Sequence, residues 1–330
     1  MIDIKPKIGV PKYKQIINSI EKAILSGTLK VGDQLPSINT IKNDHKLSRD
    51  TVLSAFNELK NRGVIKSVVG KGYYLTSDNI AIKQKVFLLF DELNSFKEDL
   101  YNSFIENLDT KIQVDIYFHH FNKTLFNKLI NDNSGYYNYY VIMPANLKNT
   151  NQAIKNLPKE SVYILDQIHP DLLKYPAIYQ NFEKDIFNKL ASITNLIKKY
   201  TTLVLIYNNA RQPKGMLKGF NKFCKTNNIP YKVIESLNNK NIEQGELYII
   251  PDDKNLLVII KKIKNSQLTL AKNIGIISYN DTLLKEVIED GITTISTDFN
   301  AMGKRLAEML LNKEQNKIEN PNHLIIRNSL

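Results

Sequence analysis

The sequence predicts an α+β winged helix-turn-helix at the N-terminus, followed by an α/β region with parallel sheets. Residues 35–74, LPSINTIKNDHKLSRDTVLSAFNELKNRGVIKSVVGKGYY, have the pattern of two short helices and a hairpin with a Gly-Lys-Gly tip. From residue 83 onward, short apolar strands alternate with helical segments at a spacing of roughly 25–30 residues. Such βαβ repeats favour parallel sheets covered by helices. A chain of 330 residues has room for two or three domains with separate cores.

The charge of the chain is unevenly distributed. The net charge is +12, and residues 1–80 contain 13 Lys and Arg against 7 Asp and Glu. A basic N-terminal module is what a polyanion partner requires, although the high Lys, Asn and Ile content of the whole chain offers a second explanation. Charge alone therefore leaves nucleic-acid binding open.

Cysteine content and apolar runs indicate a cytoplasmic protein. Cys224 is the single cysteine, so no intramolecular disulfide is possible and a reducing compartment fits. The first residues, MIDIKPKIG, lack the apolar core of a signal peptide. The longest apolar runs are strand-length, which is far too short to cross a membrane. We expect no membrane partner.

Three helices are predicted in the N-terminal module. Apolar residues at helical spacing predict the first over residues 11–26, Pro36 and Ser37 begin the second, and Ser48 is a good N-cap for the third. The third helix buries an apolar stripe made of Val52, Ala55, Phe56 and Leu59. The residues left to face outward are Arg49, Asp50, Leu53, Asn57 and Lys60. Because the N-terminal end of a recognition helix meets base edges and phosphates, we expect this face to contact DNA.

The hairpin is predicted from residues 64–69 and 73–76, joined through Gly70, Lys71 and Gly72. The glycines allow positive φ at the tip, and Lys71 is placed to reach a phosphate or the minor groove. The alternative is a small helical domain with an ordinary hairpin whose charges are merely solvated.

This module resembles the winged-helix domain of the GntR family across residues 10–76. The resemblance lies in Pro11-Lys12-Tyr13, Gln15-Ile16, Gly27, Gly32-Asp33, Leu35-Pro36-Ser37, Ser48-Arg49, Thr51-Val52, Leu59, Gly63 and Gly70-Lys71-Gly72. It implies a double-stranded DNA operator contacted by Ser37, Ser48, Arg49, Thr51, Gly70, Lys71 and Gly72. The family often has Glu-Arg where this chain has Ile38-Asn39, and Arg where it has Leu53. Asn39 is the candidate that replaces the first lost contact.

The C-terminal region contains eight candidate strands and five candidate helices. The strands are Val86–Phe90, Val114–Phe118, Tyr140–Met143, Val162–Leu165, Leu203–Tyr207, Lys232–Glu235, Leu247–Ile250 and Ile274–Ser278. The helices are Ser95–Asn107, Asp185–Lys199, Lys214–Asn227, Asn255–Asn265 and Asn300–Leu311.

Polar and aromatic residues gather where these strands end, which is the edge at which parallel sheets bind ligands. The candidates for effector binding there are Asp91, Asn94, Phe96, His119, His120, Asp166, Gln167, Gln180, Asn280 and Asp281. Carboxylates and amides beside aromatic rings suit a small polyol. Each residue alone also has an ordinary interpretation as a helix cap or turn residue.

The end of the chain resembles the effector domain of LacI-type regulators. The motifs are Ile274-Gly275-Ile276-Ile277-Ser278-Tyr279-Asn280-Asp281, Gly291-Ile292-Thr293-Thr294-Ile295 and Met302-Gly303 with Ala307 and Leu310-Leu311. The resemblance implies a two-lobed domain similar to periplasmic sugar-binding proteins, with an acidic ligand contact near Asn280 or Asp281. The family tends to place an Arg three residues before a Gly-Phe pair. This chain has Met216 there, so Arg211 or Lys214 is expected to substitute.

The combination of a GntR-type DNA-binding domain with a LacI-type sensor resembles arabinose-repressor-like chimeras. The sensor looks most like regulators of L-fucose-type sugar operons. They imply domains at 1–76 (DNA binding) and 85–330 (effector binding and dimerisation), with a linker at 77–84. We therefore expect a homodimeric repressor released from its operator by a small sugar, L-fucose or a similar monosaccharide.

The same residues bear on other functions. Adjacent His119 and His120 point to opposite faces of a strand, so a shared metal is not expected. Nucleotide-loop and nucleophile-elbow motifs are absent, so we expect no cofactor and no catalytic residue. Two rivals replace the sensor, one with a PLP-dependent aminotransferase-like domain and one with an all-helical acid-binding domain. A sensor for a non-sugar metabolite also stays open.

Overall fold

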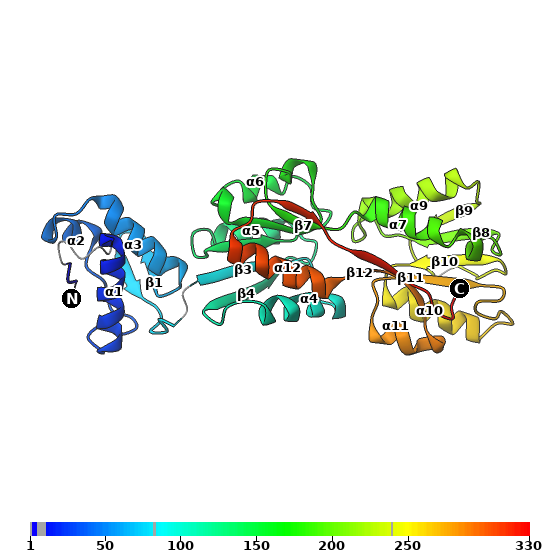
Figure 1. Cartoon of the computed structure of the whole chain (residues 1–330), viewed down its shortest axis with the longest axis horizontal. Coiled ribbons are helices and arrows are strands. Elements are labelled where there is room, and N and C mark those ends of the chain that lie inside the picture. Colours follow the sequence, from blue (N-terminus) through cyan, green and yellow to red (C-terminus); the bar gives the residue numbers. More distant parts are fainter. Residues whose placement is uncertain (1, 5–10, 82–83, 239) are drawn as a thin grey trace.

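The computed structural model describes residues 2–4, 11–81, 84–238 and 240–330. Three units follow one another along its longest axis (Figure 1). They are an N-terminal module (residues 11–76), a lobe built on the sheet that contains β3 (the N-lobe), and a lobe built on the sheet that contains β8 (the C-lobe). The predicted linker at 77–84 is described except for residues 82 and 83, which lie outside the described residues.

The N-terminal module is a winged helix-turn-helix. Its elements are α1 (Lys12–Leu25), α2 (Ile38–Asp44), α3 (Arg49–Asn61), β1 (Ile65–Val68) and β2 (Gly72–Leu75). β1 and β2 pair antiparallel to form the wing, and all three helices contribute to one apolar core. The predicted caps are present, since the Ser37 and Ser48 side chains accept backbone N–H bonds at the starts of α2 and α3.

The N-lobe is a six-stranded, all-parallel sheet in the order β13-β7-β6-β5-β3-β4. Its strands are β3 (Gln84–Phe90), β4 (Ile112–Phe118), β5 (Tyr139–Ile142), β6 (Val162–Asp166), β7 (Ala177–Tyr179) and β13 (Lys317–Glu319). Its helices are α4 (Ser95–Glu106), α5 (Lys123–Asp132), α6 (Asn151–Ile154) and α12 (Phe299–Asn312), with 3-10 turns at Lys159–Ser161 and Pro170–Leu172.

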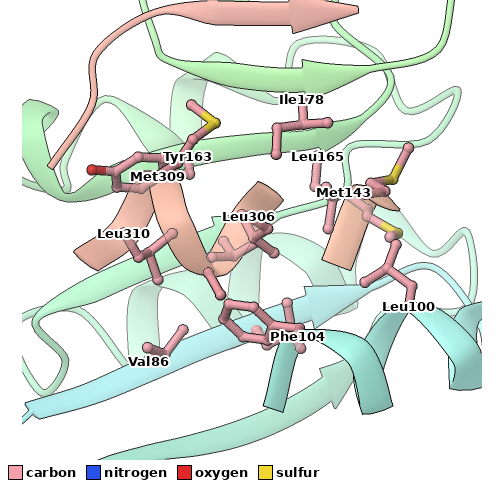
Figure 2. Packing of buried hydrophobic residues seen from close by; sticks show 14 of the residues in the cluster. Val86, Leu100, Phe104, Met143, Tyr163, Leu165, Ile178, Leu306, Met309 and Leu310 are labelled. Atoms are coloured by element: carbon pink, nitrogen blue, oxygen red, sulfur yellow. The ribbon is translucent and has the colours of Figure 1, made fainter. Parts of the chain in front are cut away.

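Alternation along β3 divides the core of the N-lobe between the two faces of the sheet. Val86, Leu88 and Phe90 pack against α4 and α12, whereas Phe87 and Leu89 pack against α5 and α6. Figure 2 shows the first cluster, in which side chains of α12 fill the space between the sheet and α4. Residues 86–90 of β3 are all apolar because helices cover both faces of this strand.

The C-lobe is a second six-stranded sheet, in the order β14-β12-β11-β10-β8-β9. Its strands are β8 (Thr202–Ile206), β9 (Tyr231–Ile234), β10 (Glu246–Ile250), β11 (Gly275–Tyr279), β12 (Thr293–Thr297) and β14 (Asn322–Ile325), and β14 alone among them is antiparallel to its neighbour. Its helices are α7 (Phe182–Ser192), α8 (Thr194–Ile197), α9 (Lys214–Thr226), α10 (Asp253–Lys264) and α11 (Leu283–Val287), with a 3-10 turn at Ile288–Asp290.

The chain passes between the lobes three times, after β7, after β12 and between β13 and β14. The crossings are bonded to one another. Asn320 donates its backbone N–H to Tyr179 O at 2.8 Å and its side-chain amide to Asp298 O at 2.9 Å. This arrangement confirms the predicted two-lobed domain and identifies the three crossings as its hinge.

All eight predicted strands are present, with ends that differ by one or two residues. The prediction missed β7, β12, β13 and β14. These strands are only three to five residues long, and β12, with the sequence TTIST, is rich in hydroxyl side chains. The helix predicted at 185–199 is interrupted at Ile193, where α7 ends and α8 begins. Within the described ranges, no helix is both long and apolar enough to cross a membrane.

Candidate functional site

Two sites are candidates, one on the N-terminal module and one between the lobes. On the module, the hydroxyls of Ser37 and Ser48 are engaged in capping. Ser37 Oγ accepts from Thr40 N at 3.0 Å and Ser48 Oγ accepts from Thr51 N at 3.2 Å. Both serines are exposed, so each holds a helix end at the surface where DNA contact was predicted.

The outer face of α3 carries the charged residues that the sequence predicted. Arg49, Asp50 and Asn57 are exposed, whereas Leu53 is half-buried. Asn39 is exposed on α2. Among the residues that the structure describes, Arg49 has no hydrogen-bond or ion-pair partner and is available to a ligand. The face is therefore open at the end of the helix that carries the positive dipole.

The wing tip is held in place from outside the hairpin. Gly70 and Gly72 have φ of 72° and 106°, which a residue with a side chain rarely adopts. Gln34 Nε2 donates to Lys71 O at 2.5 Å, so the segment before α2 supports the tip. The Lys71 side chain remains exposed, and Val69 beside it is 98% exposed.

The C-terminal end of α3 rests on the N-lobe. Lys60 Nζ lies 4.9 Å from the centre of the Tyr136 ring. With its amide nitrogen facing the loop, Asn61 donates to Gly135 O at 2.7 Å. A side chain at Gly63 would meet the Lys85 side chain at 3.3 Å. The recognition helix therefore contacts the sensor directly, and the linker is not its single connection.

The second candidate site is a cavity of about 230 Å³ between the lobes. Eight of the eleven predicted effector residues line it: Asp91, Asn94, Phe96, Asp166, Gln167, Gln180, Arg211 and Asn280. The prediction missed Glu92, Lys97, Phe121, Phe182, Gln212, Pro213, Met216, Pro251, Asp252, Asp253 and Tyr279. Most of the missed residues come from turns and helix starts of the C-lobe, and among them Met216 and Tyr279 lie in motifs that the sequence analysis had already noted.

The floor of the cavity is a buried group of charges around Lys97, which follows the N-cap Asn94 by three residues on α4. Lys97 and Asp91 are each 5% exposed and form an ion pair. Asp166 Oδ1 accepts from Gln180 Nε2 at 2.5 Å. Burial lowers the pKa of Lys97 to about 8, partly offset by the Asp166 carboxylate, and burial raises the pKa of Asp166.

This floor is bonded to the hinge. Gln180 lies on the first crossing, and its Oε1 accepts from Thr297 Oγ1 on the second crossing at 2.5 Å. The side chains of Asp166, Gln180 and Thr297 therefore connect the cavity floor to two crossings at once.

The structure does not place His119 or His120 in the cavity. His119 is fully buried, its Nε2 is 3.0 Å from Met143 O, and burial lowers its pKa to about 4, so the ring is neutral. His120 and Phe121 both have positive φ, which turns the chain after β4. The turn leaves His120 exposed beside Phe118 and brings Phe121 into the lining.

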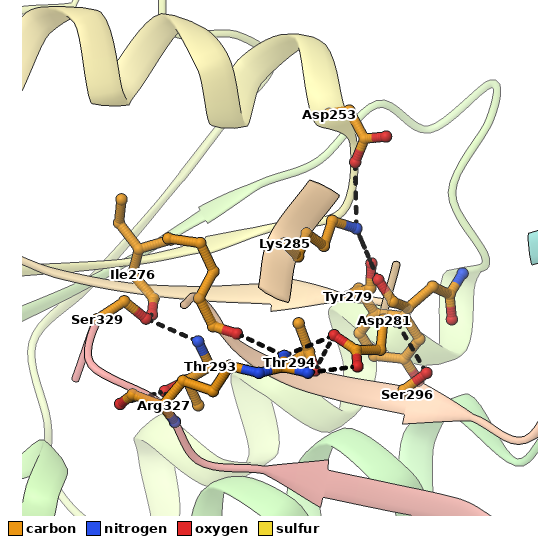
Figure 3. Close-up of polar contacts among 12 residues, drawn as sticks. Asp253, Ile276, Tyr279, Asp281, Lys285, Thr293, Thr294, Ser296, Arg327 and Ser329 are labelled. Atoms are coloured by element: carbon orange, nitrogen blue, oxygen red, sulfur yellow. Dashed lines mark hydrogen bonds and ion pairs between the residues drawn. The ribbon is translucent and has the colours of Figure 1, made fainter. Parts of the chain in front are cut away.

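Asp281 is also outside the lining, because it is held by a neighbouring strand end (Figure 3). Its two carboxylate oxygens each accept from the Arg327 guanidinium at 2.7 Å, and Oδ1 also accepts from Thr294 Oγ1 at 2.9 Å. Burial would raise the pKa of Asp281, but Arg327 and Thr294 lower it below its ordinary value. The predicted ligand contact is thus a structural ion pair.

Asn280, in contrast, faces the cavity from a fixed backbone. Buried Lys285 donates to the carbonyl oxygens of Tyr279 and Asn280 at 2.8 and 2.6 Å and pairs with Asp253 at 3.1 Å (Figure 3). Asn280 has a φ of 59°, and its buried Oδ1 has no hydrogen-bond partner in the part of the chain described. An unpaired buried amide oxygen is costly, so a side-chain movement that brought it to the cavity would be favoured by a hydroxyl donor.

The described residues contain no group of three or more His, Cys, Asp or Glu side chains suited to a metal ion. Cys224 is buried on α9, and burial raises the pKa of its thiol to about 12. It packs with Phe220 and Phe223, as an apolar residue would.

Comparison with known proteins identifies the family. Residues 12–75 match the family described as bacterial regulatory proteins, gntR family, and residues 196–330 match the periplasmic binding protein-like domain. Over 100 residues the chain is 32% identical to the HTH-type transcriptional repressor YtrA of Bacillus subtilis (strain 168), covering 30% of this chain and 73% of that protein. The chain belongs to the GntR family.

Within the GntR family, a second relative is the arabinose metabolism transcriptional repressor of Geobacillus stearothermophilus. It is 34% identical over 67 residues, which are 20% of this chain and 18% of that repressor. The match with YtrA spans most of the length of YtrA, whereas the match with the arabinose metabolism repressor covers a small part of that longer protein.

Solved structures show the fold of the sensor of this GntR-family regulator. A LacI family transcriptional regulator from Silicibacter pomeroyi superposes with a TM-score of 0.63 at 13% identity, covering 74% of this chain and 98% of that chain. A dimeric Lac repressor with an 11-residue C-terminal deletion gives 0.61 at 15% identity, covering 74% and 98%. The chain is thus a DNA-binding regulator with a LacI-like ligand-binding fold. The two sheets also rule out the all-helical sensor.

We predict that Asp281→Asn lowers the free energy of unfolding by about 1–3 kcal/mol at neutral pH, because a charged hydrogen-bonded pair is lost. The folded pKa of Asp281 is lowered, so its stabilisation is present above the unfolded value of about 4 and is lost as the pH falls below it. Urea unfolding at pH 7 and at pH 3 measures the difference, which should shrink at the lower pH.

The matched control is Asp290→Asn, since Asp290 is an exposed residue near the same loop. It should change stability little at either pH. A difference between Asp281→Asn and the parent protein that stayed constant from pH 7 to pH 3 would contradict the structural role.

Proposed function

We propose that this GntR-family regulator is a repressor whose operator affinity is controlled by a small sugar bound between the lobes. The observation that carries the proposal is the bonded path from the cavity floor through Gln180 to Thr297, which connects a ligand site to the hinge. The names of YtrA and of the arabinose metabolism repressor support repression. A monosaccharide such as L-fucose is the first candidate effector.

The lining suits a monosaccharide in size and chemistry. Three half-buried aromatic residues in the lining, Phe96, Phe121 and Phe182, suit the C–H surface of a sugar ring, whereas Tyr279 is 2% exposed. Amides of Asn94, Gln167 and Asn280 and the Asp166 carboxylate offer hydrogen bonds to hydroxyls. The arrangement is a mainly preformed site with a few polar groups that fix the orientation of the ligand.

On the DNA side, the contacts come from the exposed ends of α2 and α3 and from the wing. Ser37, Asn39, Ser48, Arg49 and Thr51 face the operator from the helices, and Gly70 to Gly72 bring Lys71 to the backbone or the minor groove. Arg49 is expected to contribute most to operator affinity, because its side chain is exposed and has no partner among the described residues.

A pair of variants separates the two roles. Arg49→Ala should weaken operator binding by about five- to 150-fold, since a specific DNA contact is worth about 1–3 kcal/mol, while sugar binding persists. Asn280→Ala should do the reverse, losing the sugar response with operator affinity kept. Fluorescence anisotropy with labelled operator DNA, with and without sugar, measures both quantities. Unchanged operator affinity in Arg49→Ala would refute the proposed DNA face.

The regulator is proposed to act as a homodimer through the C-lobe. Leu283 and Val287 on α11 are 81% and 78% exposed, and Leu257 on neighbouring α10 is also exposed. Asp253 and Lys285 join the two helices, and the proposal is that these apolar side chains belong to one surface. A patch of this kind on a surface otherwise rich in charge marks an interface, and the Lac repressor of similar fold is dimeric.

Leu283→Lys with Val287→Lys should convert the dimer to a monomer, because two charges would be placed in a self-complementary interface. Operator affinity should fall as well, since two linked half-site contacts become independent. Sedimentation equilibrium measures the mass. Val233→Lys, on the exposed edge strand β9, is the control and should stay dimeric. A double variant that remained dimeric would place the interface elsewhere.

Signal transfer is proposed to use the contact between α3 and the N-lobe in addition to the linker. Tyr136→Ala removes the ring on which Lys60 rests, so the sugar should still bind but should shift operator affinity less than in the parent. Tyr136→Phe keeps the ring face and is the control. The measured quantity is the ratio of operator Kd values with and without sugar. An unchanged ratio in Tyr136→Ala would assign the whole transfer to the linker.

A further inference from the structure

The cavity between the lobes is acidic in a chain that is otherwise basic. Its lining contains five carboxylates and two cations, although the chain as a whole has a net charge of +12. The carboxylates are Asp91, Glu92, Asp166, Asp252 and Asp253, and the cations are Lys97 and Arg211. A general excess of lysine would have given the lining a positive net charge, so its negative net charge is a local property.

The two cations are already engaged. Lys97 is buried between the carboxylates of Asp91, with which it pairs, and Asp166, which acts on its pKa. Arg211 Nη1 lies 3.6 Å from Glu92 Oε2 at the more exposed end of the lining. An anion that took either cation would leave at least one carboxylate without its partner, and in the case of Lys97 that carboxylate is buried.

Four helices, α4, α7, α9 and α10, begin at the cavity. Asparagines cap α4 and α7, α9 follows Pro213 without a side-chain cap, and carboxylates fill the start of α10. The N-terminus of an α-helix is a common anion site, and α10 begins at the cavity wall. Asp252 caps it, with Oδ1 accepting from Asn255 N at 2.9 Å and Oδ2 from Asn255 Nδ2 at 2.8 Å. Asp253 occupies the first turn. The positive end of α10 is therefore used by the protein's own carboxylates.

Building on the sensing role proposed above, we propose that this cavity selects against anionic ligands. The effector is then an uncharged polyhydroxy compound, and its phosphate ester is rejected. A phosphate monoester carries about −1.5 to −2 charges at pH 7. Placed among carboxylates in a site of low dielectric, that charge is repelled and loses its hydration without gaining a free cation.

A neighbouring cavity of about 650 Å³ does not supply the missing cation. It contains Lys148, Lys214 and Lys218, but all three are exposed, and Asp171 and Glu183 lie in the same lining. Solvated ammonium groups bind an anion weakly, because the anion gains little relative to water. A phosphate that reached this second cavity would therefore recover only part of the hydration free energy that it loses on leaving water.

The test is isothermal titration calorimetry of the full chain with matched probes, namely L-fucose, D-fructose and D-glucose and a phosphate ester of each. For the sugar that binds, the ester should bind at least about tenfold more weakly, which corresponds to about 1.4 kcal/mol. An ester that binds as tightly as its parent sugar, or more tightly, overturns the inference and leaves sugar sensing intact. Absence of binding by every sugar and ester overturns the sensing role together with the inference.

Charge variants test whether the carboxylates of the lining cause the weaker binding of the ester. Glu92→Gln with Asp252→Asn removes two negative charges at nearly constant shape, and Asn can still cap α10. The ratio of ester to sugar Kd should fall toward one. The control, Glu98→Gln with Asp99→Asn, removes the same charge from exposed positions of α4 that do not line the cavity, and it should leave the ratio as in the parent. A ratio that is equal in the two double variants overturns the electrostatic explanation.

Discussion

The hydrogen-bonded side chain of Gln180 is the interaction on which the sensor depends. Its amide nitrogen donates to Asp166 at the end of a strand in the N-lobe, and its amide oxygen accepts from Thr297 at the end of a strand in the C-lobe. A buried amide is stable only when both of its ends are satisfied. The two lobes are therefore joined through one buried side chain, and in the proposed function a ligand that competes for Asp166 would alter the angle between them.

Strand direction in the parallel sheets separates the two functions in space. The carboxyl ends of the N-lobe strands face the cavity, so their amino ends face the N-terminal module (Figure 1). Lys85, at the amino end of β3, meets the recognition-helix end at Gly63, while Asp91 follows the carboxyl end of the same strand in the cavity lining. One rigid strand therefore spans the distance between the ligand and the DNA-binding module.

Local patterns predicted most of the fold, whereas the site required the tertiary structure. Ser48 and Ser37 were recognisable as caps because capping involves neighbours in sequence. Lys97 was missed because a lysine in the first turn of an amphipathic helix is usually solvated, and nothing local shows that two carboxylates enclose it. Asp281 was assigned to the ligand because its partner Arg327 is 46 residues away in sequence. His120 left the predicted site because two successive residues with positive φ reverse the chain.

Charge also divides the molecule into compartments that suit two different ligands. The operator is a polyanion, and the basic module attracts it over a distance that the Debye length limits to about 8 Å at physiological salt. A basic sensor cavity would attract the many anionic metabolites of a cell in the same way, and so would respond to their total concentration. The carboxylates around Lys97 remove that background attraction, so that hydrogen bonding and shape decide what binds. An acidic cavity in a basic regulator thus favours a specific response, because the positive charge of the rest of the chain is not repeated in the lining that meets the ligand.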